Sequence, residues 1–277
     1  MRKEISLSHP DTPIQQALDL LAELDLPDET RQQLTTYLTS ASDELAAAHE
    51  EKAKFVSVVT HELRIPMTSI QGYTDLMRQE AVGPVTDQQK EFLGVIRNNV
   101  ERMSALVGDL SDISKLEAGR LVIDPAPLPL YGYVEEVLKD LRPQMEAKGQ
   151  VLEVDVPEDL PRVVADPQRL QQIIANLLRN AHLYSSEDKP IQVKALEQNG
   201  FVRLEVMDQG VGIGEEDQQH IFQQFFRSDD AAVREEPGWG LGLRVAKLLT
   251  EAFDGHIGFE SQLGAGSTFW VELPIDK

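Results

Sequence analysis

Apolar residues recur at intervals of three and four through the first 119 residues, which is the spacing of amphipathic helices. The pattern from residue 28 to about residue 80 is much longer than an ordinary globular helix, so it predicts a coiled coil or a long bundle helix. A shorter helical patch precedes it and ends before Pro27. Residues 42–54, with Leu45 and several alanines among charged residues, form a weak coiled-coil seam.

Residues 81–87, which include Gly83 and Pro84, predict a turn, and a second long helix follows to about Gly119. The apolar stripe of this second helix consists of Phe92, Ile96, Val100, Met103, Val107, Leu110 and Ile113. Two antiparallel amphipathic helices cannot hide each other's stripes completely. We therefore expect two copies of the hairpin to form a dimeric four-helix bundle.

After Gly119 the pattern changes, because three prolines at 125, 127 and 129 interrupt any helix and strands then alternate with helices. The predicted strands lie at 151–156, 191–196, 201–207, 257–261 and 267–273. The predicted helices lie near 131–147, 167–184 and 240–252. Asp166 and Pro167 make a good helix start, since Asp caps the first turn and Pro fits the first helical position. The second half is thus an α+β domain whose helices cover one face of a sheet.

Composition limits the classes of function that remain. The 277 residues can form two domains and a helical extension. A net charge of -21 without a basic patch argues against a nucleic-acid partner. The absence of cysteine excludes disulfides, thiolate nucleophiles and Cys-ligated zinc. No run of about 18 apolar residues can span a membrane, and no signal peptide follows Arg2. We expect a cytoplasmic chain, complete or the inner fragment of a membrane sensor.

His61 lies on the polar side of the first long helix. On a helical wheel it falls about 150° away from a stripe that consists of Phe55, Val59, Leu63, Pro66, Ile70, Tyr73 and Met77. Taken alone, an exposed histidine is more often a surface residue without a function. Glu62, however, is placed to take a proton from one ring nitrogen while the other attacks phosphorus. Pro66 predicts a bend just past the histidine, and hence two bundle packings that a signal can bias.

Several separated elements of the second half can hold a nucleotide, although no P-loop motif is present. Asn176 and Asn180 share a helical face, and an amide oxygen is an acceptable ligand for Mg²⁺. Asp208 leads into a glycine-rich turn with Gly210 and Gly212, where its carboxylate can accept from an exocyclic amine.

Two more glycine clusters follow. Gly238, Gly240 and Gly242 open a helix whose unpaired N–H groups suit phosphates. The run Gly264-Ala265-Gly266-Ser267-Thr268-Phe269 precedes the last strand. Each cluster taken alone is also compatible with ordinary turn chemistry.

The segment from Phe55 to Ile70, FVSVVTHELRIPMTSI, closely resembles the phosphoacceptor box of sensor histidine kinases. Residues 114–119, SKLEAG, resemble the end of that family's second dimerisation helix. The asparagine pair and the glycine turns resemble, in order and spacing, the N, G1, F, G2 and G3 boxes of the family's ATP-binding domain, in which the F region has Phe222, Phe225 and Phe226.

The resemblance covers about residues 45–277 and implies three parts. Residues 1–44 are an N-terminal helical segment or coiled-coil linker, or else the remnant of a sensor. Residues 45–119 are a dimerisation and histidine phosphotransfer domain. Residues 120–277 are a catalytic domain with the α/β sandwich (Bergerat or GHKL) fold that gyrase-type ATPases and heat-shock chaperones share.

The resemblance also implies roles for individual residues. ATP with Mg²⁺ would phosphorylate His61, with Glu62 as general base, and the phosphoryl group would pass to an aspartate of a response-regulator receiver domain. Asn180 would bind Mg²⁺ and Asp208 would recognise adenine, under a mobile lid at 227–237. The residues implied to contact the nucleotide are Asn176, Asn180, Tyr184, Asp208, Gly210, Gly212, Gly238, Gly240, Leu241, Gly242 and Thr268.

Three residues depart from the family pattern. Ile65 replaces a Thr or Asn that positions water, so weak phosphatase activity toward the partner is expected. Leu183 replaces a Lys or Arg near the phosphates, which weakens ATP binding unless another cation compensates; the candidates are His182, Arg179 and Lys247. Trp239 replaces a small residue and either packs on the lid or fills a hydrophobic gap.

Two alternatives to a kinase stay open. Ile65 and Leu183 are compatible with a degenerate kinase that acts as a nucleotide-gated scaffold. A gyrase-type ATPase is disfavoured, because Asn176 occupies the position where the chaperone relatives have a water-activating Glu, and an amide cannot act as a base.

Overall fold

The computed structural model describes residues 3–4, 12–24 and 26–276, which divide into two compact units. The helical unit comprises residues 9–119, and the sheet unit comprises residues 1–8 and 120–277. The helical unit ends at Gly119, the residue after which the sequence pattern changes. The predicted N-terminal segment is described only in part, because residues 1–2 and 5–11 lie outside the described residues.

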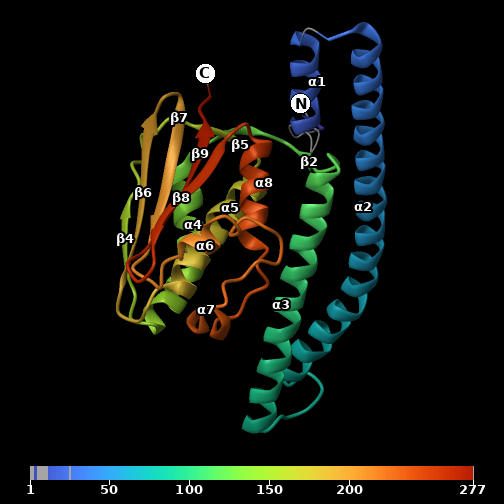
Figure 1. Cartoon of the computed structure of the whole chain (residues 1–277). Coiled ribbons are helices and arrows are strands. Elements are labelled where there is room, and N and C mark those ends of the chain that lie inside the picture. Colours follow the sequence, from blue (N-terminus) through green and yellow to red (C-terminus); the bar gives the residue numbers. More distant parts are fainter. Residues whose placement is uncertain (1–2, 5–11, 25, 277) are drawn as a thin grey trace. The chain divides into compact units, whose positions relative to one another are not determined.

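The helical unit contains α1 (Thr12–Glu23), α2 (Asp28–Arg78) and α3 (Asp87–Glu117), of which α2 and α3 form an antiparallel hairpin (Figure 1). The turn between them contains Gly83 at φ +126°, a backbone conformation that favours glycine. Thr86 then caps α3, because its hydroxyl accepts from the Gln89 amide at 3.3 Å while the Gln89 side chain accepts from the Thr86 amide at 2.8 Å. The predicted turn at 81–87 is confirmed.

Helix α2 continues through Pro66 and bends along its second half (Figure 1). A proline inside a helix removes one backbone hydrogen bond and its ring pushes against the preceding turn, so a bend in this part of α2 is the expected consequence. The bend that the sequence predicts just past His61 is therefore consistent with the fold of the helical unit.

Helix α2 has two apolar faces, and the wheel identified only one of them. Met67 packs with Val100 and Val107 of α3 in a buried cluster. The other buried residues of α2 are small or β-branched: Ala53, Val56, Thr60 and Thr74. Most of the larger predicted stripe is exposed in the single chain, namely Phe55, Leu63, Ile70, Tyr73 and Met77. The two helices of one hairpin therefore leave this stripe uncovered.

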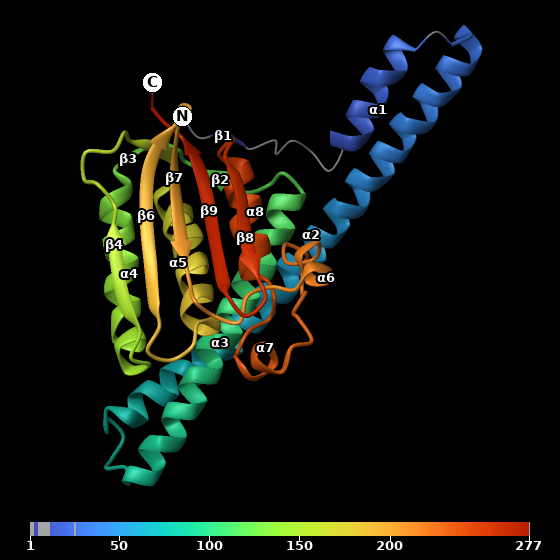
Figure 2. The same ribbon diagram turned by 60° about the vertical axis from the view of Figure 1, so that its left-hand side comes forward.

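The sheet unit is built on five strands in the order β4 (Val151–Asp155), β6 (Pro190–Gln198), β7 (Phe201–Met207), β9 (Gly266–Pro274) and β8 (His256–Gln262). Strands β4 and β6 are parallel, and the other neighbours are antiparallel. Helices α4 (Leu130–Ala147), α5 (Pro167–Tyr184) and α8 (Gly242–Ala252) cover one face of this sheet (Figure 2). The predicted arrangement is confirmed.

Several short elements complete the unit. They are the strand pairs β1 (Lys3–Glu4) with β2 (Val122–Ile123) and β3 (Ala126–Leu128) with β5 (Val163–Ala165), and the helices α6 (Glu215–Gln218) and α7 (Ala231–Glu235). None of these was predicted, because segments of two to five residues are too short to show a period.

The core of the sheet unit lies between the sheet and its helices. Val202, Leu204 and Val206 alternate on β7 and are each 1% exposed. Helix α5 contributes a dense buried face made of Leu170, Ile173, Ile174, Leu177 and Leu178. Each such side chain stabilises the fold by about 1.5–3 kcal/mol when fully buried. Helix α5, which bears both candidate asparagines, is therefore held rigidly.

Candidate functional site

His61 is exposed, as the wheel predicts. Its side chain is 69% accessible, that of Glu62 is 71% accessible, and His61 Nδ1 lies 3.3 Å from Glu62 Oε1. In a neutral imidazole one ring nitrogen carries the proton and the other has a free lone pair. Because Glu62 faces Nδ1, the arrangement favours the proton on Nδ1 and leaves Nε2 free for a second reactant.

Asp208 follows the last residue of β7 and is held by main-chain amides. Its Oδ1 accepts from the amide of Gly210 at 2.8 Å and from that of Ser267 at 3.3 Å. Burial raises the pKa of Asp208 to about 6, although these two hydrogen bonds favour the ionised form. A carboxyl group this far from water gains from an additional donor, such as the exocyclic amine of a base.

Glycines in this region allow the main chain of separate elements to come into contact. A Cβ on Gly210 would lie 2.0 Å from the carbonyl oxygen of Tyr184, and one on Gly266 would lie 2.1 Å from that of Asp208. Gly212, at φ +65°, approaches the Gln262 carbonyl equally closely. The end of α5, the Asp208 loop and the turn before β9 thereby lie against one another.

The start of α8 lies beside Asn176. A Cβ on Gly242 would lie 3.2 Å from Asn176 Oδ1. Asn176 is 8% exposed, and its Nδ2 has no hydrogen-bond partner within the described part of the chain. A buried amide without a partner costs about 1–3 kcal/mol, so a polar ligand at this point removes a penalty.

The same helix end offers donors to a ligand. Leu241 precedes α8 and provides no side-chain hydrogen bond to its first turn, so the N–H groups there are available to an anion. The Leu241 side chain itself is only 2% exposed. Its predicted contact with a nucleotide is therefore limited to its main chain, because the side chain belongs to the core.

The remaining predicted residues lie around the same site. Asn180 is half-buried one helical turn beyond Asn176. Thr268 pairs with Met207 at the end of β7. A Cβ on Gly238 would lie 3.7 Å from the Tyr184 hydroxyl. Throughout the described ranges, no group of three His, Cys, Asp or Glu side chains could hold a metal ion.

The segment predicted to be a lid, Arg227 to Pro237, is folded upon itself. The Arg227 guanidinium donates to the carbonyl oxygens of Glu236 at 2.7 Å and Gly238 at 2.9 Å, and also to that of Val233. Trp239, just beyond the lid, is 52% exposed. It therefore does not fill a hydrophobic gap, which was one of the two interpretations of this residue.

Sequence reasoning missed a polar cluster behind the end of α5. Lys148 Nζ donates to the carbonyl oxygens of His182 and Leu183 at 3.1 and 2.9 Å. Gln150 Oε1 lies 2.6 Å from His182 Nδ1. Burial, and then the charge of Lys148, lower the pKa of His182. The cation that contacts residue 183 is thus Lys148, whereas Lys247, one of the three predicted candidates, pairs with Glu251 at 3.8 Å.

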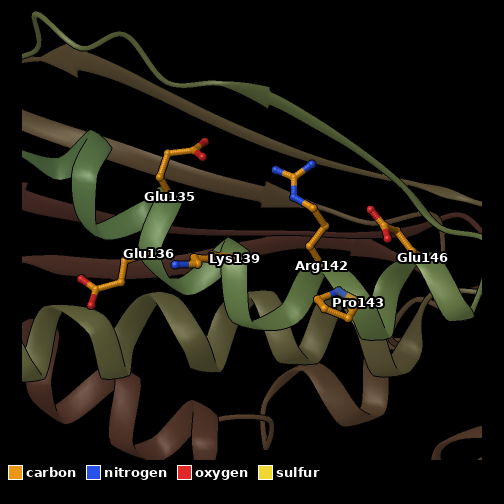
Figure 3. A pocket seen from close by; sticks show the side chains of 6 residues that line it. All are labelled: Glu135, Glu136, Lys139, Arg142, Pro143 and Glu146. Atoms are coloured by element: carbon orange, nitrogen blue, oxygen red, sulfur yellow. The ribbon is translucent and has the colours of Figure 1, made fainter.

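A separate pocket, a hollow of about 530 Å³, lies along α4 (Figure 3). Its lining mixes both signs of charge and consists of Glu135, Glu136, Lys139, Arg142, Pro143 and Glu146. None of the predicted nucleotide residues lines it. The hollow is therefore not the site that the glycine turns assemble.

Two family models match the chain. The model of the His Kinase A (phospho-acceptor) domain matches residues 51–119. The model of the histidine kinase-, DNA gyrase B- and HSP90-like ATPase matches residues 165–277. The two matches fall within the phosphotransfer and catalytic domains that the sequence predicts.

The chain is similar to curated sensor kinases. It is 32% identical over 287 residues to sensor protein GacS of Pseudomonas syringae pv. syringae, a match that covers 100% of the chain and 31% of the relative. It is 36% identical over 231 residues to signal transduction histidine-protein kinase BarA of Escherichia coli K12, with 81% and 25% covered. The chain thus spans less than a third of the length of these relatives.

Solved structures show the same architecture. Full-length ShkA in complex with AMPPNP superposes with a TM-score of 0.69 at 28% identity, covering 81% of this chain and 46% of that one. Acinetobacter baumannii AdeS gives 0.57 at 27% identity, covering 78% and 98%. The chain therefore belongs to the sensor histidine kinases, and its two domains are those of an ATP-dependent histidine kinase.

Among the helices of the described residues, none combines the length and the apolar character that crossing a bilayer requires.

Proposed function

We propose that this chain transfers the γ-phosphoryl group of ATP, bound with Mg²⁺, to His61 and then passes it to an aspartate of a response-regulator receiver domain. One observation carries the proposal: a single chain combines an exposed His61–Glu62 pair with a buried amide, on Asn176, that has no partner beside an uncapped helix end. The proposal places the chain in the cytoplasm, because ATP and receiver domains are there.

The geometry of the pair defines the first step. His61 Nδ1 lies 3.3 Å from Glu62 Oε1, and in the proposed tautomer the proton is on Nδ1, which leaves the Nε2 lone pair free. As the Nε2–P bond forms, the bond between the γ-phosphorus and the β,γ-bridging oxygen breaks, and ADP leaves. The Nδ1 proton passes to Glu62, so the product is a neutral phosphorylated ring rather than an imidazolium.

The residues of the sheet unit hold the nucleotide in this scheme. Asp208 accepts from the adenine amine, Tyr184 lines the base or ribose, and the N–H groups at the start of α8 contact the phosphates. Asn176 provides the amide that has no partner at present. Asn180 is the protein ligand of Mg²⁺, which when bound neutralises charge on the phosphates.

A second copy of the chain completes the helical unit. The large apolar side chains of α2 and α3 that are at least 40% exposed in the described structure include eight that continue the predicted stripes: Phe55, Leu63, Ile70, Tyr73, Met77, Phe92, Ile96 and Met103. An apolar surface of this extent is unusual on a monomer. A four-helix bundle of two hairpins buries it. Because His61 lies off this stripe, it stays accessible in the dimer.

The experiment that tests the proposal is labelling of the whole chain with γ-³²P-ATP and Mg²⁺. We expect a label that acid removes and alkali does not, and none in His61→Gln. Glu62→Gln should slow labelling by about 10²–10⁴-fold, the usual contribution of a general base. ATP binding without any label would instead favour the nucleotide-gated scaffold, and sustained hydrolysis without a phosphoprotein would favour an ATPase.

A further inference from the structure

Lys148 connects two elements of the nucleotide site that lie far apart in sequence. It follows the end of α4, and its Nζ contacts three acceptors: the carbonyl oxygens of His182 and Leu183 at the end of α5, and Glu236 Oε1 at 3.4 Å. An ammonium group has three N–H donors, so all of them are used. The negative end of the α5 dipole adds to the attraction.

Glu236 is held at two points. Lys148 binds its carboxylate, and Arg227 donates to its main-chain carbonyl at 2.7 Å. Arg227 also binds the carbonyls of Val233 and Gly238, on either side of Glu236. The return half of the lid, residues 233–237, is therefore fixed to the end of α5 through one side chain, Lys148, and to the beginning of the lid through another, Arg227.

The first half of the lid is held differently. Within the described structure most of its contacts are local: the Ala232 amide donates to Asp230, the Asp230 amide donates to Ser228, and Asp229 pairs with Arg234 of the return half. Arg227, at the start of the lid, also hydrogen-bonds the Tyr184 side chain. The lid thus has two links to the end of α5: Arg227 contacts Tyr184 from the start of the lid, and Glu236 is joined to α5 through Lys148. Of these two links, the one through Glu236 lies next to Gly238 and the start of α8.

We propose that Lys148 is a positioning residue for the nucleotide: with Glu236 it forms a latch that holds the return half of the lid against the end of α5. The latch keeps Gly238 facing Tyr184 before ATP arrives. The Leu183 side chain is uncharged, at a position where a Lys or Arg was expected. The ammonium group of Lys148 binds the main-chain carbonyl of Leu183. The role in phosphorylation rests on the proposed function, whereas the attachment of the lid does not.

The effect should appear in ATP affinity and not in the chemical step. Without the latch, binding of ATP must also order residues 233–237, and that entropy reduces affinity. The side chains of Lys148 and Glu236 are 23% and 31% exposed, so solvent screens the pair only in part. We expect ATP affinity to fall about three- to tenfold, with the maximal labelling rate unchanged because neither residue belongs to the proposed His61–Glu62 pair.

The test compares Lys148→Met, Glu236→Gln and the double variant in the whole chain. Lys139→Met, an exposed lysine within α4, is the matched control for Lys148, and Glu235→Gln is the control one residue before Glu236. Three readouts are needed: calorimetric affinity for ATP-Mg²⁺, the KM for ATP against the maximal labelling rate, and hydrogen exchange of residues 233–237 without nucleotide.

The latch predicts weaker ATP binding and faster exchange in both single variants, no further loss in the double variant, and wild-type behaviour in both controls. The latch would be overturned if Glu236→Gln had the same ATP affinity and the same hydrogen exchange as the control Glu235→Gln. This result would count even if Lys148→Met fails to fold. A loss in Lys148→Met alone would also overturn it, since Lys148 would then act only as a cap for α5. If the wild-type chain acquires no label while these binding results hold, the proposed function fails and the latch does not.

Discussion

Asp208 occupies a position where function and stability conflict, so replacing it should make the fold more stable and the site inactive. Its pKa rises from 3.8 to about 6 because the carboxyl is buried. The difference of about 2 pH units corresponds to about 3 kcal/mol against the ionised group. Asn in place of Asp is neutral and keeps an acceptor for the Gly210 and Ser267 amides. Asp208→Asn should therefore raise the free energy of unfolding at pH 8 by up to about 3 kcal/mol.

The pH dependence identifies the cause. A carboxyl whose pKa is raised in the folded state binds its proton more tightly there, so it contributes most stability below pH 3.8 and loses it as pH rises to about 6. The variant has no such group. The stability difference between the variant and the wild type should therefore be greatest above pH 6 and shrink steadily toward pH 4.

Urea unfolding followed by tryptophan fluorescence can measure this in the whole chain, since Trp239 and Trp270 both lie in the sheet unit. Calorimetry should show that ATP binding is lost in Asp208→Asn, because the amide can present a donor where the carboxylate accepts. A variant that is less stable than the wild type at pH 8, or a difference that does not change with pH, would refute the reasoning.

Three further results are expected. Ile65→Thr should speed removal of phosphate from a phosphorylated receiver, measured as decay of labelled receiver; an unchanged rate would mean that another group positions the water. Ile70→Glu places charge in the exposed stripe, so light scattering should show monomers where the wild type is dimeric, and a dimer that persists would argue against this interface. Gly210→Ala forces a Cβ to 2.0 Å from the Tyr184 carbonyl and should cost about 1–3 kcal/mol by urea unfolding. Its control Gly214→Ala, with nothing within 4 Å, should change stability by less than about 0.5 kcal/mol, and equal effects would contradict the packing argument.

Local patterns predicted the elements of the sheet unit well. The strand at 201–207 alternates buried and partly exposed residues along its whole length, so its period of two is visible in the sequence. Helix α5 begins at Pro167 as predicted, because Asp166 accepts from the Gln168 and Arg169 amides at 3.0 and 3.2 Å. Such signals lie within a few residues of the feature that they determine.

Features that depend on residues far apart in the sequence could not be predicted from local patterns. Helix α2 has two apolar faces, and nothing in its own sequence shows that Met67 packs against α3 while Ile70 is left exposed. Lys148 follows a helix without any distinctive motif, and Glu236 lies 88 residues away from it. Tertiary structure alone brings them together, so the latch could not be predicted from spacing.

The central claim is that the Nε2 atom of His61 receives the phosphoryl group of ATP. The most direct measurement is to incubate the chain with ATP and Mg²⁺, keep it alkaline, and locate the phosphate by peptide mass spectrometry and ³¹P NMR. The account predicts a phosphoramidate at Nε2 of His61 and nowhere else. Phosphate on a different residue, or an unmodified His61 after the ATP has been consumed, would contradict it.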